Sequence, residues 1–497
     1  MARRSVGAEL PFIGSLSRSQ GQLGRQLAQA LRNAVKRGDL KPGELLPSSR
    51  VLANSLNVAR GVVTEAYEQL VAEGVLESRA KAGTRVSRAL GNESTREVTR
   101  PMSEATQPKA LPRSVAHYEK VADEFSPLPH VPFTISVPVN QTVPEDIWRR
   151  IGNRVRARGP GAPAGYDHQQ GAEVLREEIA DYVRRSRSVH CSANQIVVTS
   201  GIQQALYLCC KILLDVGDSV WVEDPAYRGL TAILEHSVPG TNMVPIPVDD
   251  EGMDVNVGIE IAKSAKAAFV TPSHQYPLGM PLSMSRRNAL LAWAREANAW
   301  IVEDDYDSEL RYAGHPFPSL QGLDPSRVIY LGTFSKILFP SLRLGYAIVP
   351  KGLEKAFCGA RALMDRHPPS ADQHVLAAFM KEGHLDRHIR KIRGVYAERR
   401  LQLTSLIKSA IPSSLAWLQP SDQGMHLILW ITTGIDDKML AKAALEQGVA
   451  ARAVSTMYAS KSNRSGLVLG LGDFSDEQIA YGVNVLAKLI LGAHSKK

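Results

Sequence analysis

Residues 328–336 read Val-Ile-Tyr-Leu-Gly-Thr-Phe-Ser-Lys, an apolar run that passes into small and hydroxylated residues and ends at a lysine. The run predicts a buried strand over residues 328–331, with Lys336 in the loop that follows it. Four similar runs precede it and are separated by helical stretches: residues 196–199, 219–222, 267–270 and 299–302. This alternation predicts an α/β fold with a mostly parallel sheet, in which ligands bind beyond the carboxyl ends of the strands.

Reactive side chains follow two of these strands. Asp304 comes just after the run 299–302, where a buried carboxylate needs a cationic partner such as a protonated pyridine nitrogen. Tyr306, two residues further on, is placed to hydrogen-bond a phenolic oxygen on the same ring. An amine in a partly dry site, such as that of Lys336, has a lowered pKa and can form a Schiff base with an aldehyde. Each residue alone also has an ordinary structural explanation, so the combination carries the argument.

A phosphate site is predicted at the start of a helix. Residues 200–203, Ser-Gly-Ile-Gln, end the strand 196–199, and a small-residue turn at a helix N-terminus presents N–H groups to a phosphate. Arg343 can add a bidentate charged contact, and Thr333 can add a hydroxyl group. Tyr227 is placed to stack on the face of a bound ring.

This chain order resembles that of the fold type I pyridoxal-phosphate enzymes, the aspartate aminotransferase superfamily, over about residues 131–497. The resemblance implies pyridoxal 5'-phosphate held by Lys336 as an internal aldimine, with Asp304 on the ring nitrogen and Tyr306 on the phenolic oxygen. It also implies a homodimer with the site at its interface, where Tyr166 reaches the cofactor of the other subunit. The expected cofactor-binding residues are Lys336, Asp304, Tyr306, Tyr227, Ser200, Gly201, Ile202, Gln203, Thr333, Arg343 and Tyr166.

Two positions depart from the aminotransferase pattern. Tyr276 stands where true aminotransferases usually have an asparagine that touches the cofactor oxygen. Val468, within Leu-Val-Leu-Gly, stands where an arginine of that superfamily clamps the substrate carboxylate. Arg452 or Arg464 is a candidate replacement whose place the sequence does not give. We therefore expect no catalytic residues beyond the Schiff-base Lys336, and a signal that is pyridoxal phosphate itself or an unusual amine.

The N-terminal residues follow a different pattern. Apolar residues four apart predict a helix over residues 20–37, and two shorter helices follow, over about residues 49–56 and 60–73. Residues 75–86 predict a two-stranded ribbon, so the segment is predicted to be a winged helix-turn-helix whose third helix enters the major groove. Val63, Tyr67, Leu70 and Val71 are expected to face its core. The residues expected to contact DNA are Arg50, Arg60, Gly61, Thr64, Lys81 and Gly83.

Charge supports a nucleic-acid partner. Residues 1–90 carry 14 Lys and Arg against 7 Asp and Glu, which is +7 of the net charge of +9. A basic segment on a near-neutral body suggests a polyanion partner, while a small helical domain that binds protein is the alternative. The four cysteines have no metal-ligand spacing, and no metal site is expected. No apolar run reaches membrane-spanning length and the N-terminus lacks the core of a signal peptide, so we expect a cytoplasmic protein.

Residues 16–87 resemble the GntR family of bacterial transcription factors, through the motifs at residues 46–50 (Leu-Pro-Ser-Ser-Arg), 58–60 (Val-Ala-Arg) and 83–86 (Gly-Thr-Arg-Val). A GntR head on an aminotransferase-like body is identified with the MocR subfamily of regulators, which the motif at residues 271–279 also resembles. The resemblance implies a pyridoxal-phosphate-dependent transcriptional regulator that binds double-stranded promoter DNA and controls vitamin B6 or amine and amino-acid metabolism.

The expected organisation is a multidomain chain. A winged helix-turn-helix domain occupies residues 1–87, a flexible linker rich in Pro and Ser residues 88–130, and an effector-binding and dimerisation domain residues 131–497. Three hypotheses stay open. The chain is a regulator that senses through Lys336, a catalytically active aminotransferase with an appended DNA-binding domain, or a DNA-binding protein whose body has lost the cofactor and only dimerises.

Overall fold

The computed structural model describes residues 10, 13, 16–18, 21–79, 83–91, 112, 115–139, 144–157, 165–312, 314, 317–432, 434–460 and 464–494. The chain divides into two compact units, Met1–Leu111 and Pro112–Lys497, and each is described by itself.

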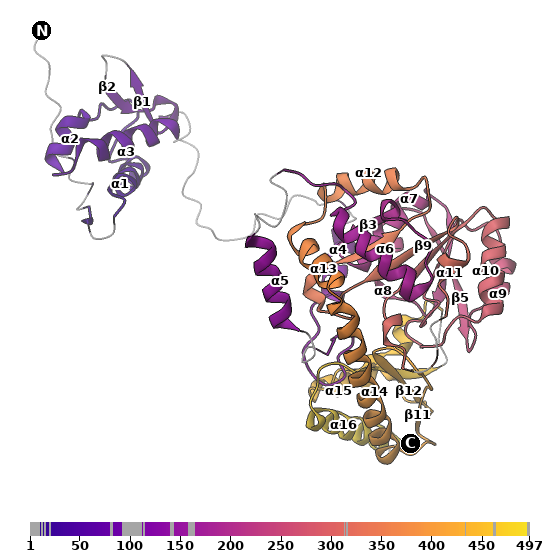
Figure 1. The fold of residues 1–497 in the computed structure, drawn as a ribbon. Helices are drawn as coiled ribbons and strands as arrows, with labels where there is room; N and C mark the ends of the chain where they lie inside the picture. The colour runs from indigo at the N-terminus through magenta and orange to yellow at the C-terminus, as the bar shows by residue number, and fades with distance from the viewer. Residues whose placement is uncertain are drawn as a thin grey trace, which may run out of the picture. The chain divides into compact units, whose positions relative to one another are not determined.

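The first unit is a winged helix-turn-helix, as the sequence predicts (Figure 1). Its elements are α1 (Leu23–Arg37), α2 (Ser49–Ser55), α3 (Arg60–Ala72), β1 (Leu76–Arg79) and β2 (Gly83–Val86). Gly38 ends α1 in the left-handed conformation at φ 81°, which glycine adopts without steric cost. The Ser48 side chain accepts a hydrogen bond from the Val51 amide and caps α2. The antiparallel pair β1–β2 forms the wing.

Helices α1 and α3 pack through their apolar stripes. Leu27 and Leu31 of α1 and Val63 and Leu70 of α3 are completely buried in the small core of this unit. The expectation for Val71 is wrong, because its side chain is 37% exposed. Val71 follows Leu70 by one residue, and a step of about 100° around the helix turns it out of the stripe that Val63 and Leu70 share.

The second unit contains an eight-stranded sheet in the order β3-β10-β9-β8-β7-β4-β5-β6. The strands are β3 (Ile196–Thr199), β4 (Ser219–Asp224), β5 (Asn242–Asp249), β6 (Gly252–Met253), β7 (Ala267–Val270), β8 (Trp300–Asp305), β9 (Val328–Thr333) and β10 (Gly345–Ile348). The five strands from β9 to β5 run parallel to one another, and β10 is antiparallel to both of its neighbours. The predicted α/β fold with a mostly parallel sheet is confirmed.

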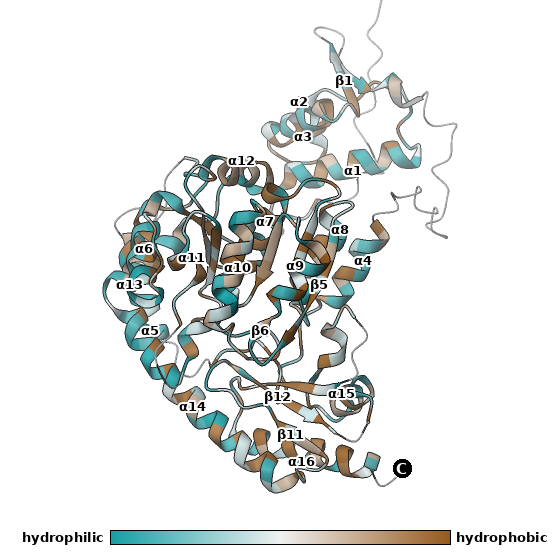
Figure 2. Ribbon diagram, turned by 90° about the vertical axis from the view of Figure 1, so that its right-hand side faces the viewer, coloured by the Kyte–Doolittle hydropathy of each residue, from teal (hydrophilic) through white to brown (hydrophobic). Residues whose placement is uncertain are grey.

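Helices cover both faces of this sheet. Successive residues of β4 point to opposite faces: Val220 and Val222 pack under α7 (Ile202–Leu213), α8 (Arg228–Ser237) and α12 (Glu354–Asp365), whereas Trp221 packs with the other helix layer. That second layer contains α9 (Val255–Ala262), α10 (Met284–Glu296) and α11 (Leu320–Leu323). In Figure 2, α9 and α10 carry both teal and brown residues, as expected of helices that cover a sheet with one face.

A smaller antiparallel sheet, which the sequence analysis did not predict, follows the large one. Its order is β11-β12-β14-β13, with β11 (Ala416–Leu418), β12 (His426–Ile431), β13 (Arg452–Ala453) and β14 (Ser465–Gly470). Figure 1 shows α14 (His384–Ala410), α15 (Asp437–Glu446) and α16 (Asp476–His494) around it. The remaining helices of this unit are α4 (Val115–Glu124), α5 (Glu145–Ala157), α6 (Glu173–Arg187) and α13 (Ala371–Lys381).

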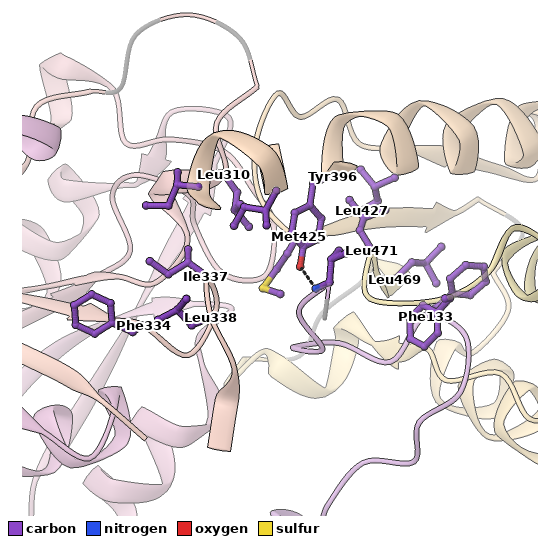
Figure 3. Packing of buried hydrophobic residues seen from close by; sticks show 14 of the residues in the cluster. Phe133, Leu310, Phe334, Ile337, Leu338, Tyr396, Met425, Leu427, Leu469 and Leu471 are labelled. Carbon is purple, nitrogen blue, oxygen red and sulfur yellow. Dashed lines mark hydrogen bonds between the residues drawn. The ribbon is translucent and has the colours of Figure 1, made fainter. Parts of the chain in front are cut away.

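One apolar cluster joins the two sheets. Phe334 and Leu338, from the loop after β9, belong to the same buried cluster as Leu427 of β12 and Leu469 of β14 (Figure 3). At its centre the Val139 amide donates a hydrogen bond to the Tyr396 hydroxyl over 3.1 Å. The loop that carries Lys336 is therefore fixed between the two sheets by apolar packing on both sides.

The linker prediction differs from the structure at residues 115–124, which form helix α4. Glu124 pairs with Arg228 of α8 at an O–N distance of 2.6 Å, and the rings of His117 and His236 stack with centroids 5.1 Å apart. No residue of α4 is buried, and the linker prediction passed over this helix. Residues 92–111 lie outside the described part of the chain.

Within the described residues, no helix combines the length and the apolar character needed to cross a membrane.

Candidate cofactor site and DNA-binding surface

A cavity of about 510 Å³ opens beyond the carboxyl ends of β8 and β9. The parallel strands deliver Asp304 from β8 and Thr333 from β9 to this edge of the sheet, and the loop after β9 adds Lys336. The predicted cofactor-binding residues that line the cavity are Ile202, Gln203, Tyr227, Asp304, Tyr306, Thr333, Lys336 and Arg343. The structure therefore brings most of the predicted site residues together around one space.

The phosphate end of the site consists of the start of α7 and Arg343. Gly201 is the residue before the helix, at φ 80°, and an added Cβ there would meet the guanidinium of Arg343 at 3.4 Å. The Arg343 Nη2 atom donates to the Ser200 carbonyl over 2.8 Å. Gly201 thus adopts the positive φ that begins this turn, and the Arg343 guanidinium lies close to the helix N-terminus. The positive charge of Arg343 and the free N–H groups of the helix start together suit a phosphate.

Asp304 has the environment of a carboxylate that needs a cation. It is 9% exposed, and its Oδ1 atom has no hydrogen-bond partner among the described residues. Burial, together with the nearby carboxylates Asp305 and Glu223, raises the pKa of Asp304 to about 8. A protonated ring nitrogen would supply the missing partner and restore the charged form. The residues present therefore fit the ring of pyridoxal phosphate.

Lys336 lies in the same dry surroundings. Burial lowers the pKa of its amine to about 8, against the opposing attraction of Asp307 and Asp304. Near neutral pH a much larger share of this amine is unprotonated than in an exposed lysine, and only the unprotonated amine can attack an aldehyde.

Two buried side chains hold Tyr306. The Nδ1 atom of His274 lies 2.9 Å from Asp307 Oδ2 and 3.0 Å from the Tyr306 hydroxyl. Burial, followed by the charge of Asp307, keeps the pKa of Tyr306 well above its usual value, so the hydroxyl stays protonated and able to donate. On the other side of the site, the Tyr227 hydroxyl donates to Gln203 Oε1 over 3.1 Å.

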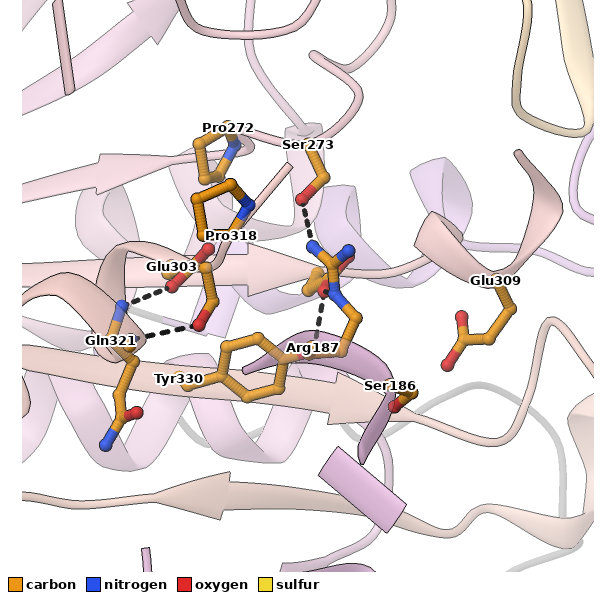
Figure 4. A network of polar contacts seen from close by, with 12 residues as sticks. Ser186, Arg187, Pro272, Ser273, Glu303, Glu309, Pro318, Gln321 and Tyr330 are labelled. Atoms are coloured by element: carbon orange, nitrogen blue, oxygen red, sulfur yellow. Dashed lines mark hydrogen bonds and ion pairs between the residues drawn. The ribbon is translucent and has the colours of Figure 1, made fainter. Parts of the chain in front are cut away.

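A polar network fixes the end of β8 behind the site (Figure 4). Arg187 donates from Nε to Asp305 Oδ2 over 2.7 Å and from Nη2 to Ser273 Oγ over 2.6 Å. The Tyr330 hydroxyl donates to the same carboxylate, and Glu303 accepts the Gln321 amide over 3.0 Å. Asp304 lies between Glu303 and Asp305 in the sequence, and the hydrogen bonds of these two neighbours fix the backbone that carries it.

Three predicted residues do not line the cavity. Ser200 and Gly201 form the turn behind Arg343 and contribute backbone rather than side chains. Tyr166 is 80% exposed and lies beside Arg366 and His367, with the Arg366 guanidinium 4.9 Å from its ring centroid.

Several lining residues were not predicted. They include Thr271, Ser335, His426, Thr456, Met457 and the segment Glu124, Phe125, Ser126 and Leu128, whereas Arg452, a candidate replacement for the missing arginine, does line the cavity. His274 lies within the motif at residues 271–279, but a single sequence gives no sign that its side chain contacts Asp307. Segment 124–128 was assigned to the linker, and its place at the cavity depends on the packing of α4 against α8.

The DNA-binding surface follows the predicted arrangement at the residues that the structure describes. Arg50, Arg60 and Gly61 are exposed at the starts of α2 and α3, and the Arg60 Nε atom donates to Ser49 Oγ over 3.3 Å. The Thr64 hydroxyl donates back to the Arg60 carbonyl. Gly83 opens the second wing strand at φ 81°, and Lys81 lies outside the described residues. Their roles on DNA stay predictions.

The chain is similar to known proteins in both units. Residues 139–483 match the class I and II aminotransferase family, and residues 23–86 match the gntR family of bacterial regulatory proteins. The "Probable rhizopine catabolism regulatory protein MocR" of Rhizobium meliloti is 35% identical over 95% of this chain and 94% of its own length. The "HTH-type pyridoxine biosynthesis transcriptional regulator PdxR" of Corynebacterium glutamicum is 32% identical over 93% of this chain and 94% of its own length.

Solved aminotransferases have the fold of the second unit. The kynurenine aminotransferase of Pyrococcus horikoshii matches with a TM-score of 0.67 and 28% identity over 82% of this chain and 99% of its own. LysN, the α-aminoadipate aminotransferase of Thermus thermophilus, solved with N-(5'-phosphopyridoxyl)-L-leucine, matches with a TM-score of 0.67 and 26% identity over 73% of this chain and 93% of its own.

The two kinds of evidence agree. The cavity is lined by Lys336, Asp304 and Arg343, and the matching structures include aminotransferases solved with PMP or with N-(5'-phosphopyridoxyl)-L-leucine. The first unit has the fold of the DNA-binding family that its sequence matches. The chain therefore belongs to the MocR subfamily of GntR transcriptional regulators, in which a winged helix-turn-helix is fused to a pyridoxal-phosphate-binding body of the class I and II aminotransferase family.

Proposed function

We propose that the affinity of this regulator for promoter DNA changes when a ligand occupies the cavity around Lys336. The proposed ligand is pyridoxal phosphate itself or an amine that reacts with it. The observation that carries the proposal is that one cavity is lined both by Lys336 and by Asp304, whose Oδ1 atom has no hydrogen-bond partner among the described residues. When bound, pyridoxal phosphate supplies an aldehyde that takes up a primary amine. The names of two relatives, for pyridoxine biosynthesis and for rhizopine catabolism, support vitamin B6 or amine metabolism as the controlled process.

The position of segment 124–128 supports a route from the ligand to the DNA-binding unit. This segment lines the cavity through Glu124, Phe125, Ser126 and Leu128. It also directly follows α4, which leads back along the chain toward the first unit. A ligand in the cavity would therefore contact the residues of the second unit that directly follow α4. Such a ligand acts as an allosteric effector if it binds the DNA-bound and DNA-free arrangements with different affinity.

A homodimer is part of the proposal. Tyr166 does not line the cavity of its own chain, and its ring is 80% exposed. That exposure suits a side chain that reaches the cofactor of a second subunit. Sedimentation equilibrium of the full chain, and of a Y166F variant, measures the assembly directly, and a monomeric wild-type chain would overturn this part.

Active transamination is the second candidate function. The presence of Lys336, Asp304 and Arg343 in one cavity favours it, and so do the aminotransferases that match this fold. Tyr276 and Val468 disfavour it, because the sequence pattern of true aminotransferases has an asparagine and an arginine there. We propose a sensing role without sustained turnover. Repeated turnover of an amine and a keto acid by the purified chain would instead show an enzyme.

The test of sensing combines absorbance with DNA binding. Pyridoxal phosphate is titrated into the purified protein, and the affinity for promoter DNA from its own gene neighbourhood is measured with and without the cofactor. We expect an absorbance band from protein-bound cofactor and a change in DNA affinity that both disappear in K336A. A band without any change in DNA affinity would overturn the sensing role while leaving cofactor binding intact.

A further inference from the structure

Strand β14 carries no cation at the position where aminotransferases clamp a carboxylate. Val468 is completely buried there, in an apolar cluster with Ile428 and Trp430 of β12. If the cavity recognises an anionic ligand, the charge for that contact must come from another element.

Strand β13 supplies such a charge. Arg452 is the direct cross-strand partner of Val468 in the antiparallel pair β13–β14. Directly opposed residues of an antiparallel pair point to the same face of the sheet, with Cβ atoms about 5 Å apart. The Arg452 side chain therefore leaves the sheet on the same face as the side chain of residue 468, one strand away. Arg452 indeed lines the cavity that also holds Lys336.

The charge of Arg452 is not neutralised by a carboxylate. Among the described residues no Asp or Glu oxygen lies within 4.0 Å of its guanidinium nitrogens. Arg228, another arginine of the same cavity, is by contrast paired with both Glu124 and Glu235. The positive charge of Arg452 opposes the rise in pKa that burial causes at Tyr276 and at Tyr227, two other residues that line the cavity.

Arg452 and its neighbours suit an oxyanion. A guanidinium presents N–H groups in a planar fork that matches carboxylate or sulfonate oxygens, and Tyr276 and Thr456 place hydroxyl groups in the same cavity. Both residues that depart from the aminotransferase pattern thus belong to one region. Tyr276 replaces the usual asparagine, and Val468 replaces the usual arginine beside Arg452.

We propose that Arg452 anchors an anionic group of the effector, so that the effector is a primary amine that also carries a carboxylate or a sulfonate. This inference rests on the proposed function, because it names the chemical class of the ligand that the cavity around Lys336 takes. Val468 by itself suggests that the cavity has lost its carboxylate anchor. In this proposal the cation is instead supplied by Arg452 on the neighbouring strand β13.

The test compares amines with and without an anionic group on the protein loaded with pyridoxal phosphate. Isothermal titration calorimetry measures the binding of 4-aminobutyrate, 3-aminopropanesulfonate and uncharged butylamine to the wild type, R452Q, R452K and R464Q. Arg464 is the matched control, because its guanidinium lies over the Trp430 ring at 3.8 Å and does not line the cavity. The absorbance of bound cofactor is read in the same samples.

We expect at least one anionic amine to bind about tenfold more tightly than butylamine, and R452Q to remove most of that preference. R464Q should behave as the wild type, and R452K should lie between R452Q and the wild type because it keeps the charge without the planar fork. The relative affinity of the carboxylate and the sulfonate identifies which anion the site takes.

The proposal is overturned if butylamine binds as tightly as both anionic amines, if neither anionic amine binds, or if R452Q keeps the preference. Absence of cofactor absorbance in the wild type would instead contradict the proposed function. The two failures are therefore told apart within one set of samples.

Discussion

Asp304 and Lys336 line one cavity, and each favours the charged form of the other. Burial outweighs this attraction, so the pKa of Asp304 rises to about 8 while the pKa of Lys336 falls to about 8. Near neutral pH, Asp304 is therefore mostly protonated and uncharged, whereas the Lys336 amine is mostly protonated but has a larger unprotonated share than an exposed lysine. A bound ring with a protonated nitrogen would give Asp304 the cation that Lys336 does not fully provide.

Replacement of Asp304 by asparagine should weaken the binding of pyridoxal phosphate. A hydrogen bond to a charged group contributes about 1.5–3 kcal/mol, so we expect a loss of roughly 10- to 100-fold in affinity. Absorbance titration measures it, with D146N as the control because Asp146 is 82% exposed. Unchanged affinity of D304N would show that the carboxylate does not face the ring nitrogen.

The rate at which the cofactor attaches to Lys336 should depend on pH with a midpoint near 8. Below this pH the amine is protonated and cannot attack an aldehyde, and above it the amine is free, so the rate rises with pH. Stopped-flow absorbance at a series of pH values measures the midpoint. A midpoint near that of an ordinary lysine, about 10.4, would mean that the Lys336 amine is well solvated.

Replacement of Gly201 by alanine should weaken phosphate binding. The added Cβ would meet the Arg343 guanidinium at 3.4 Å, and the backbone at φ 80° is costly for any residue with a side chain. G217A is the matched control, because Gly217 also has a positive φ, of 89°, but an added Cβ there meets nothing within 4 Å.

Both glycine variants should lose folding stability, by about 1–3 kcal/mol from the backbone alone. Only G201A should lose affinity for pyridoxal phosphate. Equal affinity losses in the two variants would assign the effect to general destabilisation and not to the phosphate site.

Replacement of Arg60 by alanine should weaken sequence-specific DNA binding by about 1–3 kcal/mol, because the side chain is exposed at the start of the predicted recognition helix. Fluorescence anisotropy with promoter and random duplexes measures the ratio of the two affinities. R37A is the control, since Arg37 lies at the end of α1 and pairs with Asp39. An unchanged ratio in R60A would place base recognition elsewhere.

The sequence predicts what depends on local pattern. The five apolar runs became strands β3, β4, β7, β8 and β9, and the spaced leucines became α1. Much of the cofactor site was predictable for the same reason, since parallel strands deliver Asp304 and Thr333 to one edge. The roles of Lys336 and Arg343 were predicted from the order of site residues along the chain, which resembles that of fold type I pyridoxal-phosphate enzymes.

Features that depend on contacts across the chain were not predictable. The place of Arg452 follows from its register with Val468, and that pairing joins residues of a sheet that was not predicted. Helix α4 is held by Glu124 and Arg228, which are far apart in sequence and carry no periodic signal. The prediction that Val71 faces the core was wrong, because the sequence pattern does not separate an apolar residue next to the buried stripe from one within it.

The central claim is that occupancy at Lys336 controls DNA binding. It is tested most directly by the affinity of the full chain for its promoter DNA, measured with and without pyridoxal phosphate, in the wild type and in K336A. We expect the cofactor to change the DNA affinity of the wild type and to leave the DNA affinity of K336A unchanged. Equal affinities of the wild type with and without cofactor, or an undiminished response in K336A, would contradict it.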